Sequence, residues 1–153
     1  MIVKFHRRNL PDRFEREVSP RANPAIQPFA PTFLGTSVDV KSTPRNHCFQ
    51  GEDHRLFIEA FVPGKDLREL YEEEPILRYV SAGIAVARYR ALGRITQTLG
   101  WTLSNMHPGN IRFSRYDDKK ALIVDWGGQT EGVDMQKYTD LIDRTIYGPF
   151  LKQ

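Results

Sequence analysis

The segment 105–128 constrains the fold of this chain more than any other part of the sequence. Within it, the apolar runs 110–113 and 121–125 flank a polar turn, a pattern that predicts a hairpin-like pair of strands. Pairing of these strands brings Asn110, which begins the first run, close to Asp125, which ends the second. Two oxygen ligands at one edge of a sheet suit a hard cation such as Mg²⁺ with phosphate. The residues alone leave an alternative open, in which Asp125 only caps a turn at the nearby glycine pair.

The segment 76–99 predicts the clearest helix of the chain. Apolar residues recur in it at spacings of three and four, and they give one apolar stripe of the kind that packs against a core: Leu77, Val80, Ile84, Ala87, Ala91, Ile95 and Leu99. Gly100 follows the last of them, at the position where a left-handed residue commonly ends a helix. We therefore expect a single long helix that ends at this glycine.

The remaining segments predict a mixture of short strands and short helices. We expect strands at 2–5, 32–34, 37–40 and 56–62, and helices at 13–18, 66–73 and 133–147. Prolines concentrate between residues 20 and 55, where periodicity is weak and irregular connections are expected. Such a mixture is that of an α+β fold.

A length of 153 residues is that of one ordinary domain, so we expect a single domain over 1–153. A chain of this size buries roughly 68–70% of its unfolded surface, which allows a core without disulfides. The single cysteine, Cys48, excludes an intramolecular disulfide and fits a reducing compartment, so we expect a cytoplasmic location. No apolar run approaches the ~20 residues that span a bilayer, so we expect no membrane span.

The net charge of +3 is unevenly distributed along the chain. Residues 1–50 carry eight Lys and Arg against four Asp and Glu, a balance that suits contact with phosphate on a nucleotide, a nucleic acid or a membrane surface. The plain alternative is a solvated basic face. Residues 1–21 do not interleave aromatic and basic residues as a stacking platform for bases does, so we do not expect nucleic acid as a partner.

The order of these motifs resembles the protein-kinase-like fold from its third strand onward. Residues 100–111 resemble the catalytic loop, in the D-x-H-P-G-N form of small-molecule and atypical kinases, altered here to N-x-H-P-G-N. The triplet 125–127, Asp-Trp-Gly, resembles the DFG-type metal motif, and residues 56–62 followed by Pro-Gly resemble the hinge strand and hinge. The resemblance implies a truncated kinase-like fold, with a partial N-lobe and hinge strand at 1–62 and a mainly helical partial C-lobe at 63–153.

The resemblance also implies a site for ATP and Mg²⁺. Lys4 corresponds to the lysine that contacts the α- and β-phosphates, and Glu17 to the carboxylate that holds this lysine. The backbone from Glu59 to Phe61 corresponds to the hinge that reads the adenine edge. Asn110 and Asp125 correspond to the pair that holds Mg²⁺. From the residues alone, Lys4 can equally be a terminal charge and Glu17 an exposed helix acid.

The catalytic positions depart from the family pattern. Asn105 stands where the family has its catalytic aspartate, and an amide cannot accept the proton of a substrate near neutral pH. General-base assistance contributes about 10²–10⁴-fold, so we expect impaired phosphotransfer. His107 stands where the family often has a residue near the transferred phosphate, although a structural loop histidine explains it equally well.

Two further departures concern the surroundings of the site. No glycine precedes Gly35, so a glycine-rich loop before Lys4 is impossible and nucleotide affinity should be weak. The interval between Gly127 and Asp134 is too short for an activation segment that docks a peptide. Missing strands at one end and missing helices at the other would expose core edges, which predicts a protein partner.

Three functions follow from these observations. The leading prediction is a pseudokinase-like regulatory or binding module that retains ATP and Mg²⁺. The second is an active phosphotransferase for a small molecule or a protein, in which Asn105 is tolerated. The third is a basic adaptor for an acidic partner or a nucleic acid.

Overall fold

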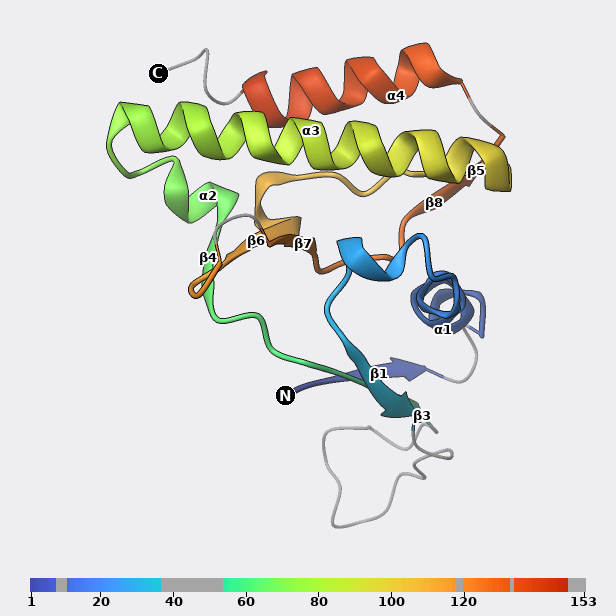
Figure 1. Ribbon diagram of the computed structural model, residues 1–153. Coiled ribbons are helices and arrows are strands. Elements are labelled where there is room, and N and C mark those ends of the chain that lie inside the picture. Colours follow the sequence, from blue (N-terminus) through green and yellow to red (C-terminus); the bar gives the residue numbers. More distant parts are fainter. Residues whose placement is uncertain (8–10, 37–53, 118–119, 133, 149–153) are drawn as a thin grey trace.

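The computed structural model describes residues 1–7, 11–36, 54–117, 120–132 and 134–148. The predicted strand at 37–40 and Cys48 lie outside the described residues. Short antiparallel sheets and helices alternate along the chain (Figure 1), which confirms the α+β class. None of the helices in these ranges is both long enough and apolar enough to cross a bilayer.

The N-terminal part is a three-stranded antiparallel sheet with the order β1-β3-β2. Its strands are β1 (Ile2–Arg7), β2 (Phe33–Thr36) and β3 (His54–Glu59). The helix α1 (Pro11–Val18) and two 3₁₀ turns, η1 (Ser19–Ala22) and η2 (Gln27–Phe29), connect β1 to β2. Strand β3, the last of the three along the chain, therefore lies in the middle of this sheet.

Two smaller sheets form the C-terminal part. One has the order β4-β6-β7, with β4 (Gly64–Asp66), β6 (Ile111–Ser114) and β7 (Ala121–Ile123). The other pairs β5 (Trp101–Leu103) with β8 (Gln129–Glu131). The β6–β7 pairing confirms the predicted hairpin. Strands β4, β5 and β8 were not predicted, because three residues are too few to show an alternating pattern.

Helices cover one side of these sheets. They are α2 (Leu67–Leu70), α3 (Pro75–Leu99) and α4 (Met135–Ile142), which continues into the π-helical turn η5 (Asp143–Tyr147). In Figure 1, α3 and α4 lie side by side, away from the N-terminal sheet. The predicted end of the long helix is confirmed, because Gly100 has a φ of 82° and lies in the left-handed region.

The face that α3 buries differs from the predicted apolar stripe. Leu77 and Val80 are about half exposed, at 49% and 54%, and Leu99 is 44% exposed. Three residues of the predicted stripe, Ile84, Ala91 and Ile95, are partly buried and pack against the core. The fully buried positions lie beside them and include several small residues: Ser81, Ala82, Ala85, Val86, Tyr89, Leu92, Gly93 and Thr96. Small side chains let α4 and the sheets approach closely, so tertiary packing overrides the larger apolar residues of the other face.

One hydrophobic core joins the helices to the two C-terminal sheets. It includes Ile26 and Phe29 from the N-terminal part and the fully buried Trp126, which follows β7. Around them pack the inner residues of the helices and strands: Leu67, Tyr89, Leu92, Leu103, Ile111, Ile123, Tyr138, Ile142 and Ile146. The loop that carries Asp125 is thus held against the core by the residue that follows it.

Candidate functional site

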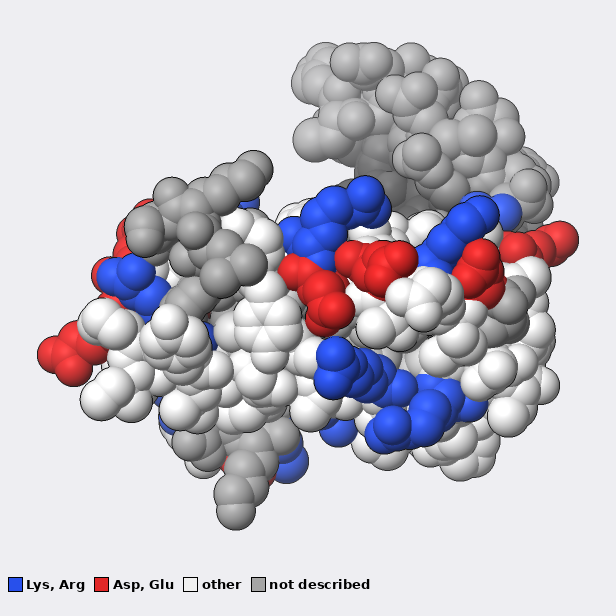
Figure 2. All heavy atoms as spheres, turned by 90° about the horizontal axis from the view of Figure 1, so that it is seen from above, with Lys and Arg blue, Asp and Glu red and all other residues white. Residues whose placement is uncertain are grey.

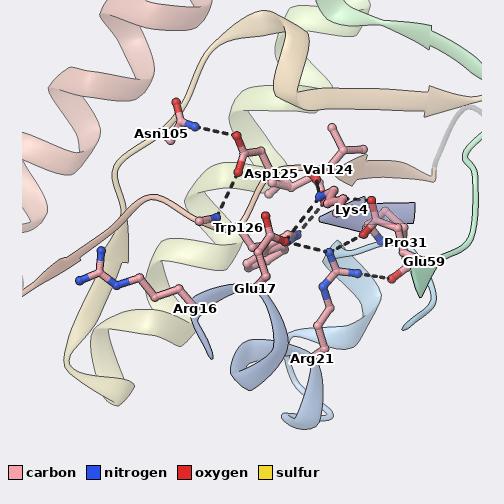
Figure 3. A network of polar contacts seen from close by, with 12 residues as sticks. Lys4, Arg16, Glu17, Arg21, Pro31, Glu59, Asn105, Val124, Asp125 and Trp126 are labelled. Carbon is pink, nitrogen blue, oxygen red and sulfur yellow. Dashed lines mark hydrogen bonds and ion pairs between the residues drawn. The ribbon is translucent and has the colours of Figure 1, made fainter. Parts of the chain in front are cut away.

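Strand β1 carries Lys4 into the space between the N-terminal sheet and the loop after β7. Its Nζ donates a hydrogen bond of 2.8 Å to the carbonyl oxygen of Val124 (Figure 3). The same nitrogen lies 3.5 Å from Glu17 Oε2 and 3.3 Å from Glu59 Oε1. The structure therefore contains the Lys4–Glu17 ion pair that the resemblance implies, and the Lys4 side chain retains 25% exposure.

Arg21 completes a buried ionic cluster behind Lys4. Its Nη2 lies 2.7 Å from Glu59 Oε2 and 3.7 Å from Glu17 Oε2, and its Nη1 donates to Pro31 O at 2.8 Å. All three charged residues are at most 4% exposed. Sequence reasoning missed Arg21, although its place one helical turn after Glu17 was a usable signal. Burial of such charges is tolerated because each finds an opposite charge.

Glu59 and Phe61 were predicted to read adenine through their backbone. Glu59 ends β3, where it pairs with Ile2 on one side and Phe33 on the other, and its side chain belongs to the ionic cluster. Between the two, the N–H of Ala60 donates to a neighbouring carbonyl, Thr32 O, at 2.8 Å. The Phe61 side chain is half exposed. A hinge role for these residues stays a prediction.

Asn110 and Asp125 come together as the hairpin predicts. The N–H of Val124 donates to Asn110 O at 2.8 Å, which makes Asn110 a direct neighbour of the residue before Asp125. The Asn110 side chain is 5% exposed, and its Nδ2 donates to Asn105 O at 2.8 Å. Its Oδ1 is thus the side-chain atom suited to a cation. The structure brings this pair together, while metal binding by it stays a prediction.

Two hydrogen bonds hold the Asp125 carboxylate. Oδ2 accepts a hydrogen bond of 2.8 Å from Nδ2 of Asn105, and Oδ1 accepts one of 3.1 Å from the N–H of Gly127 (Figure 3). The indole of Trp126 is fully buried, and its Nε1 donates to Ile123 O at 2.7 Å. This bond fixes the loop immediately after Asp125.

Gly128 allows the loop after Asp125 to lie close to Asn105. A Cβ at residue 128 would lie 2.4 Å from Asn105 Cβ and 2.9 Å from Asn105 N, closer than real Cβ atoms come. The carbonyl of Gly128 accepts a hydrogen bond of 3.0 Å from Ser104 N. The loop after Asp125 therefore needs a glycine here for the Asn105 amide to reach Asp125.

His107 has a structural contact in the loop before β6. Its exposed ring accepts a hydrogen bond at Nδ1 from Gly109 N, 3.1 Å away, at the start of the 3₁₀ turn η4 (Pro108–Asn110). This contact within the loop matches the loop-histidine interpretation, and a role near a transferred phosphate stays a prediction.

The electrostatics of the site favour a cation. Five charged side chains gather here: Lys4, Glu17, Arg21, Glu59 and Asp125. Two are positive and three negative, so their formal net charge is −1. Burial raises the pKa of Glu17 above its usual value; Lys4 opposes this shift, and the negative charge of Asp125 adds to it.

The donor set fits a cation that arrives with phosphate. Asp125 offers a carboxylate and Asn110 an amide oxygen, and Mg²⁺ typically uses one or two carboxylates together with waters and substrate phosphates. Within the described ranges, no group of three or more His, Cys, Asp or Glu side chains could hold a metal ion by itself. A bare metal would therefore find an incomplete set of ligands.

Comparison with known proteins supports the fold. No protein-family model matches the chain, and no curated protein matches it. A solved structure of vaccinia related kinase 3 is similar, with a TM-score of 0.53 and 13% sequence identity. The match covers 84% of this chain and 40% of the kinase chain, so this chain spans about two fifths of its length. At this identity the similarity bears on the fold alone, and it supports a kinase-like fold for this chain.

Proposed function

We propose that this chain is a kinase-like domain that binds ATP with Mg²⁺, is impaired in phosphotransfer and acts as a regulatory or binding module. The observation that supports it most is the position of Val124. Its carbonyl accepts from Lys4 Nζ, its N–H donates to Asn110 O, and Asp125 follows it directly. One backbone position therefore joins the three residues that would contact phosphate and metal.

The impairment follows from the chemistry of Asn105. Its amide donates to Asp125 and has no basic site for the proton of a phosphoacceptor. Loss of a general base reduces turnover by about 10²–10⁴-fold. Positioning and electrostatic stabilisation supply most of the catalysis in phosphoryl transfer, so binding can persist where turnover is low.

Nucleotide affinity should be modest. In the part of the chain that the structure describes, β1 pairs only with β3, so no other strand there pairs with the outer edge of the strand that carries Lys4. Contacts to phosphate weaken where water has free access, because the local dielectric constant is high. We expect a dissociation constant well above that of a site closed by a glycine-rich loop.

Thermal-shift titration with ATP, with and without Mg²⁺, tests the proposal. At ten times the dissociation constant, ligand stabilises the fold by about 1.4 kcal/mol, which is roughly 3–6 °C in Tm for a chain of this size. The rise should require both ATP and Mg²⁺ and vanish in Asp125→Ala, while the exposed Asp140→Ala should respond like the wild type. No rise at saturating nucleotide would leave only a scaffold function.

An active phosphotransferase is the second candidate, and the Lys4–Glu17 ion pair favours it. The Asn105→Asp variant separates the two, since it restores a carboxylate at the catalytic position. If the chain is impaired, release of the γ-phosphate should rise by about 10²-fold or more in this variant. Equal rates in the wild type and the variant would show that Asn105 does not limit turnover.

The surface of α3 supports a protein partner. Near its start, four large apolar side chains are about half exposed or more: Ile76, Leu77, Tyr79 and Val80. Clustered apolar residues of this kind commonly mark interaction sites. Light scattering of the purified protein over a dilution series should show dissociation of an assembly. A monomer at all concentrations, both purified and in its native extract, would argue against a partner.

The charges on the face formed by α3 and α4 do not support a basic adaptor surface there. On the face formed by α3 and α4, Lys and Arg side chains lie beside Asp and Glu side chains, with uncharged residues between them (Figure 2). A nucleic-acid interface requires a continuous basic surface. A polynucleotide titration with a steep salt dependence would revive this third function.

A further inference from the structure

Asn105 contacts both residues of the predicted cation pair. Its side-chain Nδ2 donates to Asp125 Oδ2 at 2.8 Å, and its backbone carbonyl accepts from Asn110 Nδ2 at 2.8 Å. The close approach of Gly128 to its Cβ fixes the start of the side chain. Asn105 therefore occupies the space between the two predicted ligands.

The orientation of the amide is unfavourable for a cation. An N–H group that donates to Asp125 Oδ2 carries partial positive charge, and it would point at any divalent ion bound to that oxygen. An ion that binds Oδ2 on the side of this N–H must therefore break the hydrogen bond. Because the Cβ of Asn105 is held against Gly128, the amide has to leave by rotation about its side-chain bonds.

We propose that the Asn105 amide competes with a divalent cation for Asp125 and so holds the carboxylate in a cation-free state. This inference rests on the proposed function, because it assumes that Asp125 and Asn110 receive the cation. The site then discriminates against the bare ion and takes the ion together with nucleotide phosphate, whose additional ligands compensate for the lost hydrogen bond.

The competition predicts the direction in which cation affinity changes when the Asn105 amide is removed. A hydrogen bond of ordinary net strength, when it must be broken for binding, weakens apparent affinity by about threefold to tenfold. Removal of the amide in Asn105→Ala should therefore tighten cation binding by this factor. If the amide were instead a ligand of the ion, through its Oδ1, the same substitution would weaken binding.

Mn²⁺ provides the probe, since the electron paramagnetic resonance signal of the free ion reports binding without any need for turnover. The full chain, in excess over ATP, is titrated with Mn²⁺ in wild type, Asn105→Ala and Ser104→Ala, the last being a matched exposed neighbour. The same titration of ATP without protein gives the share of the ion that the nucleotide binds by itself. We expect tighter binding in Asn105→Ala alone. Equal or weaker binding in this variant overturns the inference and leaves the proposed function intact. Absence of binding in all three proteins overturns both.

Nuclear magnetic resonance of the cation-free protein gives a second readout. The side-chain amide protons of Asn105 should exchange with water more slowly in the wild type than in Asp125→Ala, because the carboxylate accepts one of them. Addition of Mg²⁺ with ATP should release these protons and make their exchange in the wild type as fast as in Asp125→Ala. Unchanged protection after Mg²⁺ and ATP bind would show that the hydrogen bond persists beside the cation, which contradicts the competition.

Discussion

The contact between α3 and α4 makes a sharp prediction, because α3 holds two glycines in different surroundings. A Cβ at Gly93 would lie 2.3 Å from Tyr138 Cε1, on the facing helix. A Cβ at Gly83 would meet nothing within 4 Å. Both residues are helical, so Gly→Ala removes the same backbone freedom at each position. We expect Gly83→Ala to stabilise the protein and Gly93→Ala to destabilise it.

The magnitudes follow from three contributions. Alanine in a helix interior gains about 1 kcal/mol over glycine, and Gly83→Ala should show most of this gain. At Gly93 the same gain is opposed by about 1–3 kcal/mol of overpacking. Displacement of Tyr138 would also strain the 2.6 Å hydrogen bond from its hydroxyl to Tyr89 O, worth about 0.5–1.5 kcal/mol. The two variants should therefore differ by about 2–4 kcal/mol in the free energy of unfolding.

Urea unfolding followed by circular dichroism measures this difference through the midpoint, at equal m-values. A second variant, Gly93→Ala with Tyr138→Leu, relieves the contact and should recover part of the loss. If Gly93→Ala and Gly83→Ala shifted the midpoint equally and in the same direction, α4 would not lie against α3 at Gly93, and the packing argument would be wrong.

The remaining predictions concern buried side chains that make hydrogen bonds. Burial raises the pKa of Tyr71 to about 12. The neutral phenol therefore stabilises the fold below pH ~10, and this contribution is lost as the pH rises through 12. In Tyr71→Phe, the free energy of unfolding measured with urea should fall less steeply at alkaline pH than in the wild type. The Asp66→Ala variant loses the reciprocal cap with Glu69, and its free energy of unfolding should fall by about 0.5–2 kcal/mol, whereas Asp66→Asn should retain most of it. Replacement of the buried Trp126 by Phe leaves Ile123 O without its donor and should cost about 1–3 kcal/mol in the same assay, and a change below the error of the measurement would contradict the assigned hydrogen bond.

Local sequence signals were sufficient to predict the elements that are defined by turn residues and by the spacing of apolar residues. Gly100 marks the end of α3, and the two apolar runs around a polar turn give the β6–β7 hairpin. Because the hairpin could be predicted, the proximity of Asn110 and Asp125 could be predicted from it. These features depend on residues close in sequence, so tertiary contacts do not have to be known.

Features that depend on distant partners were beyond the sequence. The face that α3 buries is decided by α4 and by the sheets, which is why Ala82 and Gly93 are inside and Leu77 is not. The pairing of β5 with β8 joins two strands of three residues each, too short for a pattern. The spacing of Arg21 from Glu17 is visible in the sequence, but the contact of Arg21 with Glu59, 38 residues later, is not.

The two hydrogen bonds at Val124 use main-chain atoms, and this has an evolutionary consequence. Any residue other than proline offers the same N–H and C=O, so drift at position 124 would leave the attachments of Lys4 and Asn110 in place. Selection for this geometry would then be visible at position 4, whose side chain makes one of the two bonds, and as an avoidance of proline at position 124. It would not preserve a particular side chain at position 124.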